Sequence, residues 1–98
     1  MIKQEAGQLR VSGPLTMGTV AALMDIDLSG AEDRLVIDLG QVEAVDSAAV
    51  SLLLVWVRSF SRKGVRPCFA NLPDNLSSLA RLYGVAELLP LCGKDDRA

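Results

Sequence analysis

The chain has 98 residues, of which half are hydrophobic but only 4% aromatic, and its formal net charge is −2. This length excludes two domains, so we expect one domain over residues 1–98, with an aliphatic core and a polar tail at about 93–98. The acidic balance and the lack of a basic run argue against a nucleic-acid partner. No segment approaches the roughly 20 apolar residues of a membrane span, and residues 1–5 lack the apolar continuation of a secretory signal.

The spacing of apolar residues, capping residues and turn residues predicts the secondary structure. In chain order, the expected elements are strands at Ile2–Glu5 and Gln8–Ser12, a helix from about Met17 to Ile26, a polar loop at Leu28–Asp33, a strand at Arg34–Leu39, a helix at Ser47–Lys63, a strand at Arg66–Ala70, a helix from Asp74 or Asn75 to about Tyr83, and a last helical turn or closing strand at Val85–Leu91. Because helices separate the later strands, parallel pairing is expected. We therefore expect an α/β fold with a small mixed sheet and helices packed mainly on one face.

Turn and capping residues are expected to set several of these boundaries. Ser12-Gly13-Pro14 should end the second strand, Thr16 should cap the first helix, and Asp74 or Asn75 should cap the helix that runs to about Tyr83. Pro67 indicates an edge strand or a strand start, and Gly84 should end the last long helix in a left-handed conformation.

The two cysteines, Cys68 and Cys92, lack the spacing of a metal site or of a CxxC redox motif. We therefore expect two free thiols in a cytosolic protein.

The helix expected at 47–63 has a core side and a second apolar shoulder. At 100° per residue, one side collects Ala49, Val50, Leu53, Trp56, Val57 and Phe60. The opposite stripe, about 60° wide, holds Ser47, Ser51, Arg58 and Arg62. Together, the shoulder residues Ala48, Leu52, Leu54 and Val55 are more than one sheet can cover. The shoulder predicts an interface, and packing under a neighbouring helix is the alternative.

The sequence contains few residues that could serve in catalysis. The chain has no histidine and no Gly-rich phosphate loop. Asp38, Glu43 and Asp46 could suggest acid–base work or Mg²⁺ binding, but solvated loop charges and a helix cap at Asp46 account for them. We therefore expect a binding module without a metal or a cofactor.

A resemblance to the STAS domain is carried by Val36-Ile37-Asp38-Leu39, Val42, Val45-Asp46-Ser47, the leucine-rich helix that follows, and Arg62-Lys63-Gly64. That family includes anti-sigma factor antagonists, cytoplasmic parts of anion transporters, and a small subunit of bacterial phospholipid-transport ABC complexes. The resemblance runs from about Leu9 to Pro90. Near its end, Leu79-Ala80-Arg81-Leu82-Tyr83-Gly84-Val85 and Leu88-Leu89-Pro90 are similar to the subunit of the Mla phospholipid-transport complex in particular.

The resemblance implies a role for Ser47. In the antagonists, the matching residue is phosphorylated by the anti-sigma kinase; in the lipid-transport subunit, it is a threonine important for binding the ATPase. Asp46 matches the motif aspartate. Ala48 and Ala49 stand where the family commonly has small residues including glycine. Alanine removes the flexibility that close approach by a kinase loop would use, which favours docking over phosphorylation.

Electrostatic arguments also favour docking over phosphorylation at Ser47. The helix start would stabilise a phosphate on Ser47, but Asp46 would oppose it. Arg58 lies eleven residues further on, roughly 16 Å along the axis, and cannot clamp that phosphate. A modification would then act mainly by disrupting an apolar interface. Simple helix capping is the alternative role for Ser47.

Two functions remain as expectations. The first is a non-catalytic, cytoplasmic accessory subunit of an inner-membrane ABC phospholipid transporter that maintains outer-membrane lipid asymmetry. It would be peripheral to the membrane, without inserting into it, and would bind the ATPase subunit through Asp46, Ser47, Ala48, Ser51, Leu54, Val55 and Arg58. The second is an antagonist of an anti-sigma factor kinase, switched by phosphorylation of Ser47.

Overall fold

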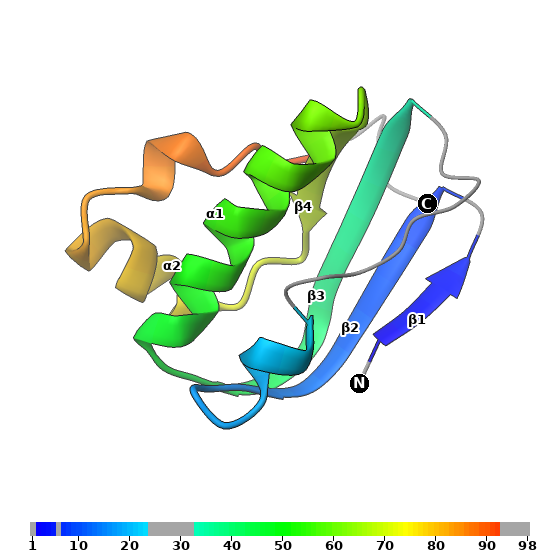
Figure 1. Ribbon diagram of the computed structural model, residues 1–98. Coiled ribbons are helices and arrows are strands. Elements are labelled where there is room, and N and C mark those ends of the chain that lie inside the picture. Colours follow the sequence, from blue (N-terminus) through cyan, green and yellow to red (C-terminus); the bar gives the residue numbers. More distant parts are fainter. Residues whose placement is uncertain (1, 6, 24–32, 93–98) are drawn as a thin grey trace.

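A four-stranded sheet carries the helices on one of its faces (Figure 1). The computed structural model describes residues 2–5, 7–23 and 33–92. The elements are β1 (Ile2–Glu5), β2 (Gln8–Leu15), the 3₁₀ turn η1 (Val20–Leu23), β3 (Arg34–Val45), α1 (Ser47–Arg62), β4 (Arg66–Ala70), α2 (Asp74–Leu82) and the 3₁₀ turn η2 (Ala86–Leu88). The strand order is β1-β2-β3-β4, with β1 antiparallel to β2 and the other pairs parallel. The predicted α/β fold with a small mixed sheet is confirmed.

The central strands are longer than the sequence predicted. Glycine and proline at 13 and 14 were expected to end β2, yet the strand continues to Leu15. Shifts in register between β2 and β3 absorb these residues, so that Gly13 still pairs with Val42 and Leu15 with Val45. β3 likewise continues past Leu39 to Val45. The long β2–β3 pair brings the ends of both strands together at the start of α1.

The core lies between the sheet and α1. Along β3, Leu35, Ile37 and Leu39 are buried on the helix side, as expected for every second residue of a strand. From α1 the buried residues are Ala49, Val50, Leu52, Leu53, Trp56 and Phe60. The expectation that Leu52 belongs to an exposed shoulder is therefore wrong, whereas Val57, placed in the core by periodicity, is only half-buried. The helix contacts more than the sheet, so its buried side is wider than one sheet would make it.

The first predicted helix is a short turn among the described residues. Only Val20–Leu23 is helical, as a 3₁₀ turn, and residues 24–26 of the prediction, like the loop at 28–32, lie outside the described residues. Thr16 does not cap through its side chain: its carbonyl accepts from the Thr19 and Val20 N–H groups. The Trp56 indole N–H donates to the carbonyl of Leu23 over 2.8 Å. This bond fastens the turn to the middle of α1.

The C-terminal elements complete the helix layer and the sheet edge. β4 has the predicted bounds and lies at the end of the strand order, as Pro67 indicated. Gly84 follows α2 with a φ of 71°, the predicted left-handed end. The predicted side-chain cap of α2 is absent: Pro73 is the N-cap residue, and the Asn75 amide instead donates to the carbonyl of Glu43. This bond ties the start of α2 to the end of β3.

The expectation of two free thiols is wrong. Cys68 and Cys92 form a disulfide, 24 residues apart in sequence. Leu91 forms a parallel bridge with Phe69, whose N–H donates to Pro90 and whose carbonyl accepts from Cys92. The return of residues 90–92 to β4 brings the two sulfur atoms together, which sequence spacing alone does not reveal. The polar tail expected at 93–98 lies outside the described residues.

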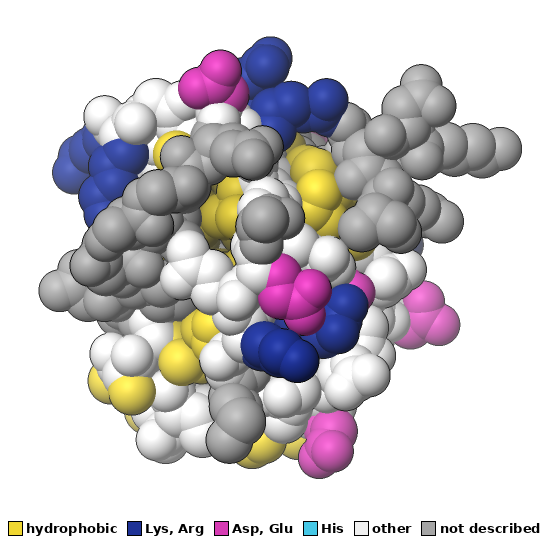
Figure 2. Space-filling view, turned by 90° about the vertical axis from the view of Figure 1, so that its right-hand side faces the viewer, with side chains coloured by type: hydrophobic (Ala, Val, Ile, Leu, Met, Phe, Trp, Pro, Cys, Tyr) yellow, Lys and Arg dark blue, Asp and Glu magenta, His cyan; other side chains and the backbone are white. Residues whose placement is uncertain are grey.

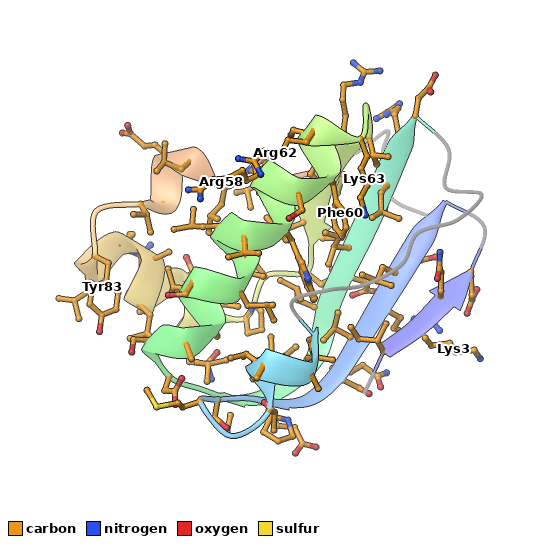
Figure 3. All side chains as sticks on the ribbon, viewed as in Figure 1. Lys3, Arg58, Phe60, Arg62, Lys63 and Tyr83 are labelled. Carbon is orange, nitrogen blue, oxygen red and sulfur yellow. A yellow bond between two sulfur atoms is a disulfide. The ribbon has the colours of Figure 1, made fainter. Side chains whose placement is uncertain are left out.

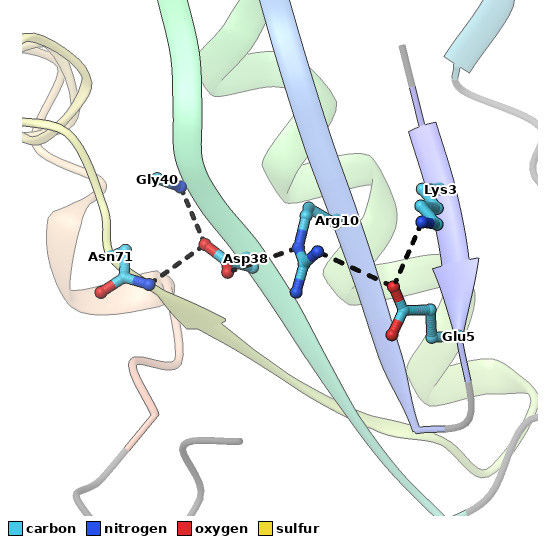
Figure 4. Close-up of polar contacts among 6 residues, drawn as sticks. All are labelled: Lys3, Glu5, Arg10, Asp38, Gly40 and Asn71. Carbon is cyan, nitrogen blue, oxygen red and sulfur yellow. Dashed lines mark hydrogen bonds and ion pairs between the residues drawn. The ribbon is translucent and has the colours of Figure 1, made fainter.

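The face of the sheet away from the helices carries a polar network (Figure 4). Asp38 lies within β3, and its Oδ1 accepts from the Gly40 N–H and the Asn71 amide over 2.9 and 3.1 Å. Arg10 lies between Asp38 and Glu5, with N–O distances of 4.0 and 3.7 Å. Figure 2, viewed from the β1 side, shows side chains of both charges in contact. The expectation that Asp38 is a solvated loop charge is therefore wrong.

Breaking the disulfide should lower the free energy of unfolding without abolishing the fold. In the chain-entropy model, a loop of this length stabilises by up to about 3.5 kcal/mol. Urea unfolding with and without a thiol reductant, followed by the fluorescence of buried Trp56, measures the difference. The double variant Cys68→Ser/Cys92→Ser is the control, because its stability should not respond to the reductant. An identical response in both proteins would contradict the bond.

Candidate functional site

Asp46 positions the site by joining three segments at the start of α1. Its Oδ1 accepts from the Ala48 N–H over 2.8 Å, which caps the helix, and its Oδ2 accepts from the Met17 N–H over 3.0 Å. Its own N–H donates to the carbonyl of Leu15 over 3.3 Å. The predicted capping role of Asp46 is confirmed. The same carboxylate also fixes the chain that leaves β2 against the helix start.

Ser47 is the first residue of α1 and is exposed. The alternative that Ser47 itself caps the helix is wrong, because Asp46 is the N-cap residue. The Ser47 hydroxyl makes no hydrogen bond with any of the described residues. Its side chain is therefore free for an external contact.

A shallow groove of about 190 Å³ begins at Ser47. Its lining residues are Ser47, Val50, Ser51 and Leu54 from α1, and Tyr83 and Val85 from the segment that follows α2. We call this depression the Ser47 groove. The left-handed turn at Gly84 places Tyr83 and Val85 against α1. The groove therefore combines two small hydroxyl side chains with an apolar floor.

Exposed apolar side chains lie beside the groove. Tyr83 is 53% exposed, and Leu82, its neighbour in sequence, is 75% exposed. Figure 3 shows Tyr83 directed away from the sheet, on the helix side of the molecule. At the helix start, Met17 is also 75% exposed while its N–H is held by Asp46. Large exposed side chains near a concave apolar surface are typical of protein-contact sites.

The structure brings together some of the predicted site residues and separates others. Ser47, Ser51 and Leu54 line the groove, whereas Ala48 and Val55 are half-buried outside it. Arg58 is exposed further along α1. Tyr83 and Val85 were missed as site residues, although they fall within the segment whose resemblance to the Mla subunit was noted. Helical periodicity could not find them, because they approach α1 from another element.

Buried polar side chains and metal-binding clusters are both absent from the described residues. None of the residues buried in the described part of the chain is polar or charged. Within residues 2–5, 7–23 and 33–92, no three histidine, cysteine, aspartate or glutamate side chains gather where they could hold a metal ion. No helix of that part is long and apolar enough to span a bilayer.

The family model described as "Mlab, STAS domain" matches residues 1–90, most of the chain. The chain belongs to the STAS domain family. The predicted resemblance to that family, and to its Mla-type members, is confirmed. No curated protein matches the chain.

Two solved structures share the STAS fold. One is a sulfate transporter family protein from Wolinella succinogenes, with 14% identity and a TM-score of 0.70, covering 98% of this chain and 84% of the other. The second is the anti-sigma factor antagonist SpoIIAA in its unphosphorylated form, with 16% identity and a TM-score of 0.68, covering 98% of this chain and 90% of the other. At these identities the likeness concerns the fold.

Replacing Asp46 by alanine should destabilise this STAS domain by about 1–2 kcal/mol, because the helix loses its cap and the Met17 N–H loses its acceptor. Urea unfolding followed by Trp56 fluorescence measures the change. Glu43→Ala is the matched control, since it removes an exposed carboxylate from the same strand end and should shift stability by less than about 0.5 kcal/mol. Equal stabilities of the two variants would contradict the role assigned to Asp46.

Proposed function

We propose that this chain is a non-catalytic accessory subunit of an inner-membrane ABC phospholipid transporter that maintains outer-membrane lipid asymmetry. It binds the ATPase subunit through the Ser47 groove, in the cytoplasm, and is held at the membrane through its complex. The observation that carries the proposal is the exposed, unbonded Ser47 at an apolar groove, in a chain that matches the Mla-type STAS model. STAS domains generally act as regulatory or accessory domains.

The size and lining of the groove favour a protein partner over a small ligand. Ligand pockets usually enclose roughly 300–1,000 Å³ and surround most of their ligand, whereas this groove is smaller and shallow. Tyr83 adds a large, half-exposed aromatic side chain at its edge. Aromatic anchors beside apolar depressions often carry much of the binding energy of protein interfaces.

Small side chains at the helix start suit close docking. Ser47, Ala48 and Ser51 keep the first turns of α1 narrow, so that a partner backbone can approach the helix. Leu54 provides apolar surface one turn further on. Asp46, Ala48 and Val55 support this surface from its border, and Arg58 extends it.

Ser47→Arg and Leu54→Asp should each abolish co-purification with the ATPase subunit. The first fills the groove with a long charged side chain, and the second places a carboxylate on its apolar floor. Pull-down from cells that express the whole transporter measures the effect. Both variants should keep the circular dichroism and Trp56 fluorescence of the original chain.

Gln4→Arg is the matched control for Ser47→Arg. Gln4 is exposed on β1, the edge strand farthest from β4 in the strand order and on the opposite side from the groove. This variant should co-purify with the ATPase as the original chain does. Unchanged co-purification of both groove variants would overturn the proposed surface.

A second candidate function is that of an anti-sigma factor antagonist switched by phosphorylation of Ser47. It is favoured by the exposed hydroxyl of Ser47 at a helix start and by the fold shared with SpoIIAA. The helix N-terminus would stabilise a phosphate there, whereas the neighbouring Asp46 carboxylate would oppose it.

This second function predicts one phosphate on Ser47 after incubation with the cognate kinase and ATP, and none in Ser47→Ala. Intact-mass spectrometry with peptide mapping measures it. Ser51→Ala is the control, because it removes a nearby groove hydroxyl and should leave the modification in place. Unmodified protein in the presence of an active kinase would eliminate this candidate.

A further inference from the structure

Positive charge is concentrated at the C-terminal end of α1. Residues 58–66 contain Arg58, Arg62, Lys63 and Arg66 and no acidic residue, in a chain whose net charge is −2. Figure 3 shows the labelled Arg58, Arg62 and Lys63 near this end, far from Lys3 on β1. The chain therefore has a local basic surface despite its acidic total.

These cations have no carboxylate partner within the described residues. The ion pairs between two described residues join Lys3, Glu5, Arg10 and Asp38, all on the outer face of the sheet. Arg62 lies in the last turn, where a positive charge offsets the helix dipole. Arg58 lies a full turn earlier, where its charge interacts less strongly with the helix dipole. Stabilisation of the helix therefore explains the position of Arg58 less well.

The basic residues continue the surface that contains the Ser47 groove. Arg58 follows the groove residue Leu54 by one helical turn, and Arg62 follows Arg58 by another. By the helical rise, Arg62 lies roughly 22 Å from Ser47 along the axis. A protein interface of ordinary size covers roughly 800 Å² per partner, a patch roughly 30 Å across. A partner seated on the groove therefore also reaches Arg58, and its edge reaches Arg62.

Covering these guanidinium groups has a chemical consequence for the partner. A charged group that loses water without gaining a partner is strongly unfavourable. We infer that the ATPase surface that meets the groove carries carboxylates opposite Arg58 and Arg62, so that its apolar contact at Ser47 is extended by an acidic patch along α1. This inference rests on the proposed function. It adds a fixed orientation of the bound ATPase subunit, because only one direction of docking places the carboxylates opposite Arg58 and Arg62.

Binding of the full chain to the purified ATPase subunit tests the inference, with calorimetry as the readout. The double variant Arg58→Glu/Arg62→Glu should weaken binding by roughly tenfold or more, because attraction becomes repulsion. Binding of the original chain should also weaken as NaCl rises from roughly 50 to 300 mM, whereas the double variant should show the opposite dependence, because salt screens its repulsion. Lys3→Glu is the control, since it makes the same kind of charge change on β1 and should bind as the original chain does.

The possible outcomes separate this inference from the proposed function. If Ser47→Arg abolishes binding while the double variant binds normally and salt has no effect, the acidic patch is refuted and the groove stands. If the original chain does not bind the ATPase at all, both fall. If the double variant binds the ATPase normally but loses binding to phosphatidylglycerol vesicles that the original chain shows, the basic residues serve an anionic membrane and the inference is overturned.

Discussion

The carboxylate of Asp46 is the interaction on which the rest of the site depends. Its two oxygens accept from two backbone N–H groups that are 31 residues apart in sequence, one in α1 and one in the turn after β2. A helix start needs an acceptor for its free N–H groups. The turn after β2 needs a contact that fixes its direction. Because the Asp46 side chain meets both needs, the Ser47 hydroxyl is not needed to hold this part of the fold. The exposed hydroxyl is thus a result of the cap that precedes it.

The residues around that cap explain how far the sequence could predict the structure. The Asp46-Ser47 junction was recognised because a polar pair between an apolar strand and an apolar helix is a local signal. The bounds of β4 and the left-handed turn at Gly84 were local in the same sense. By contrast, Gly13 and Pro14 would end an isolated strand, but parallel pairing with β3 carries β2 through them. That outcome depends on a partner strand more than 25 residues away.

The predictions for single side chains were wrong for the same reason, because their positions depend on segments distant in sequence. Leu52 is buried although helical periodicity placed it outside the core, because the helix layer encloses α1 from more than one side. Tyr83 reaches the groove only through the turn after α2. The pairing of Cys68 with Cys92 follows from the return of residues 90–92 to β4. The backbone hydrogen bonds at Phe69 hold the same segment against β4.

The return of residues 90–92 to β4 also bears on how the chain is made. The N–H and carbonyl of buried Phe69 find their partners at Pro90 and Cys92, more than 20 residues later in the sequence. Buried backbone groups without partners are strongly unfavourable. During synthesis, β4 therefore lacks these partners until residues 90–92 have left the ribosome. The β2–β3 pair and α1 precede these residues in the sequence and can assemble earlier, whereas the edge of the sheet at β4 closes only after residues 90–92 have been made.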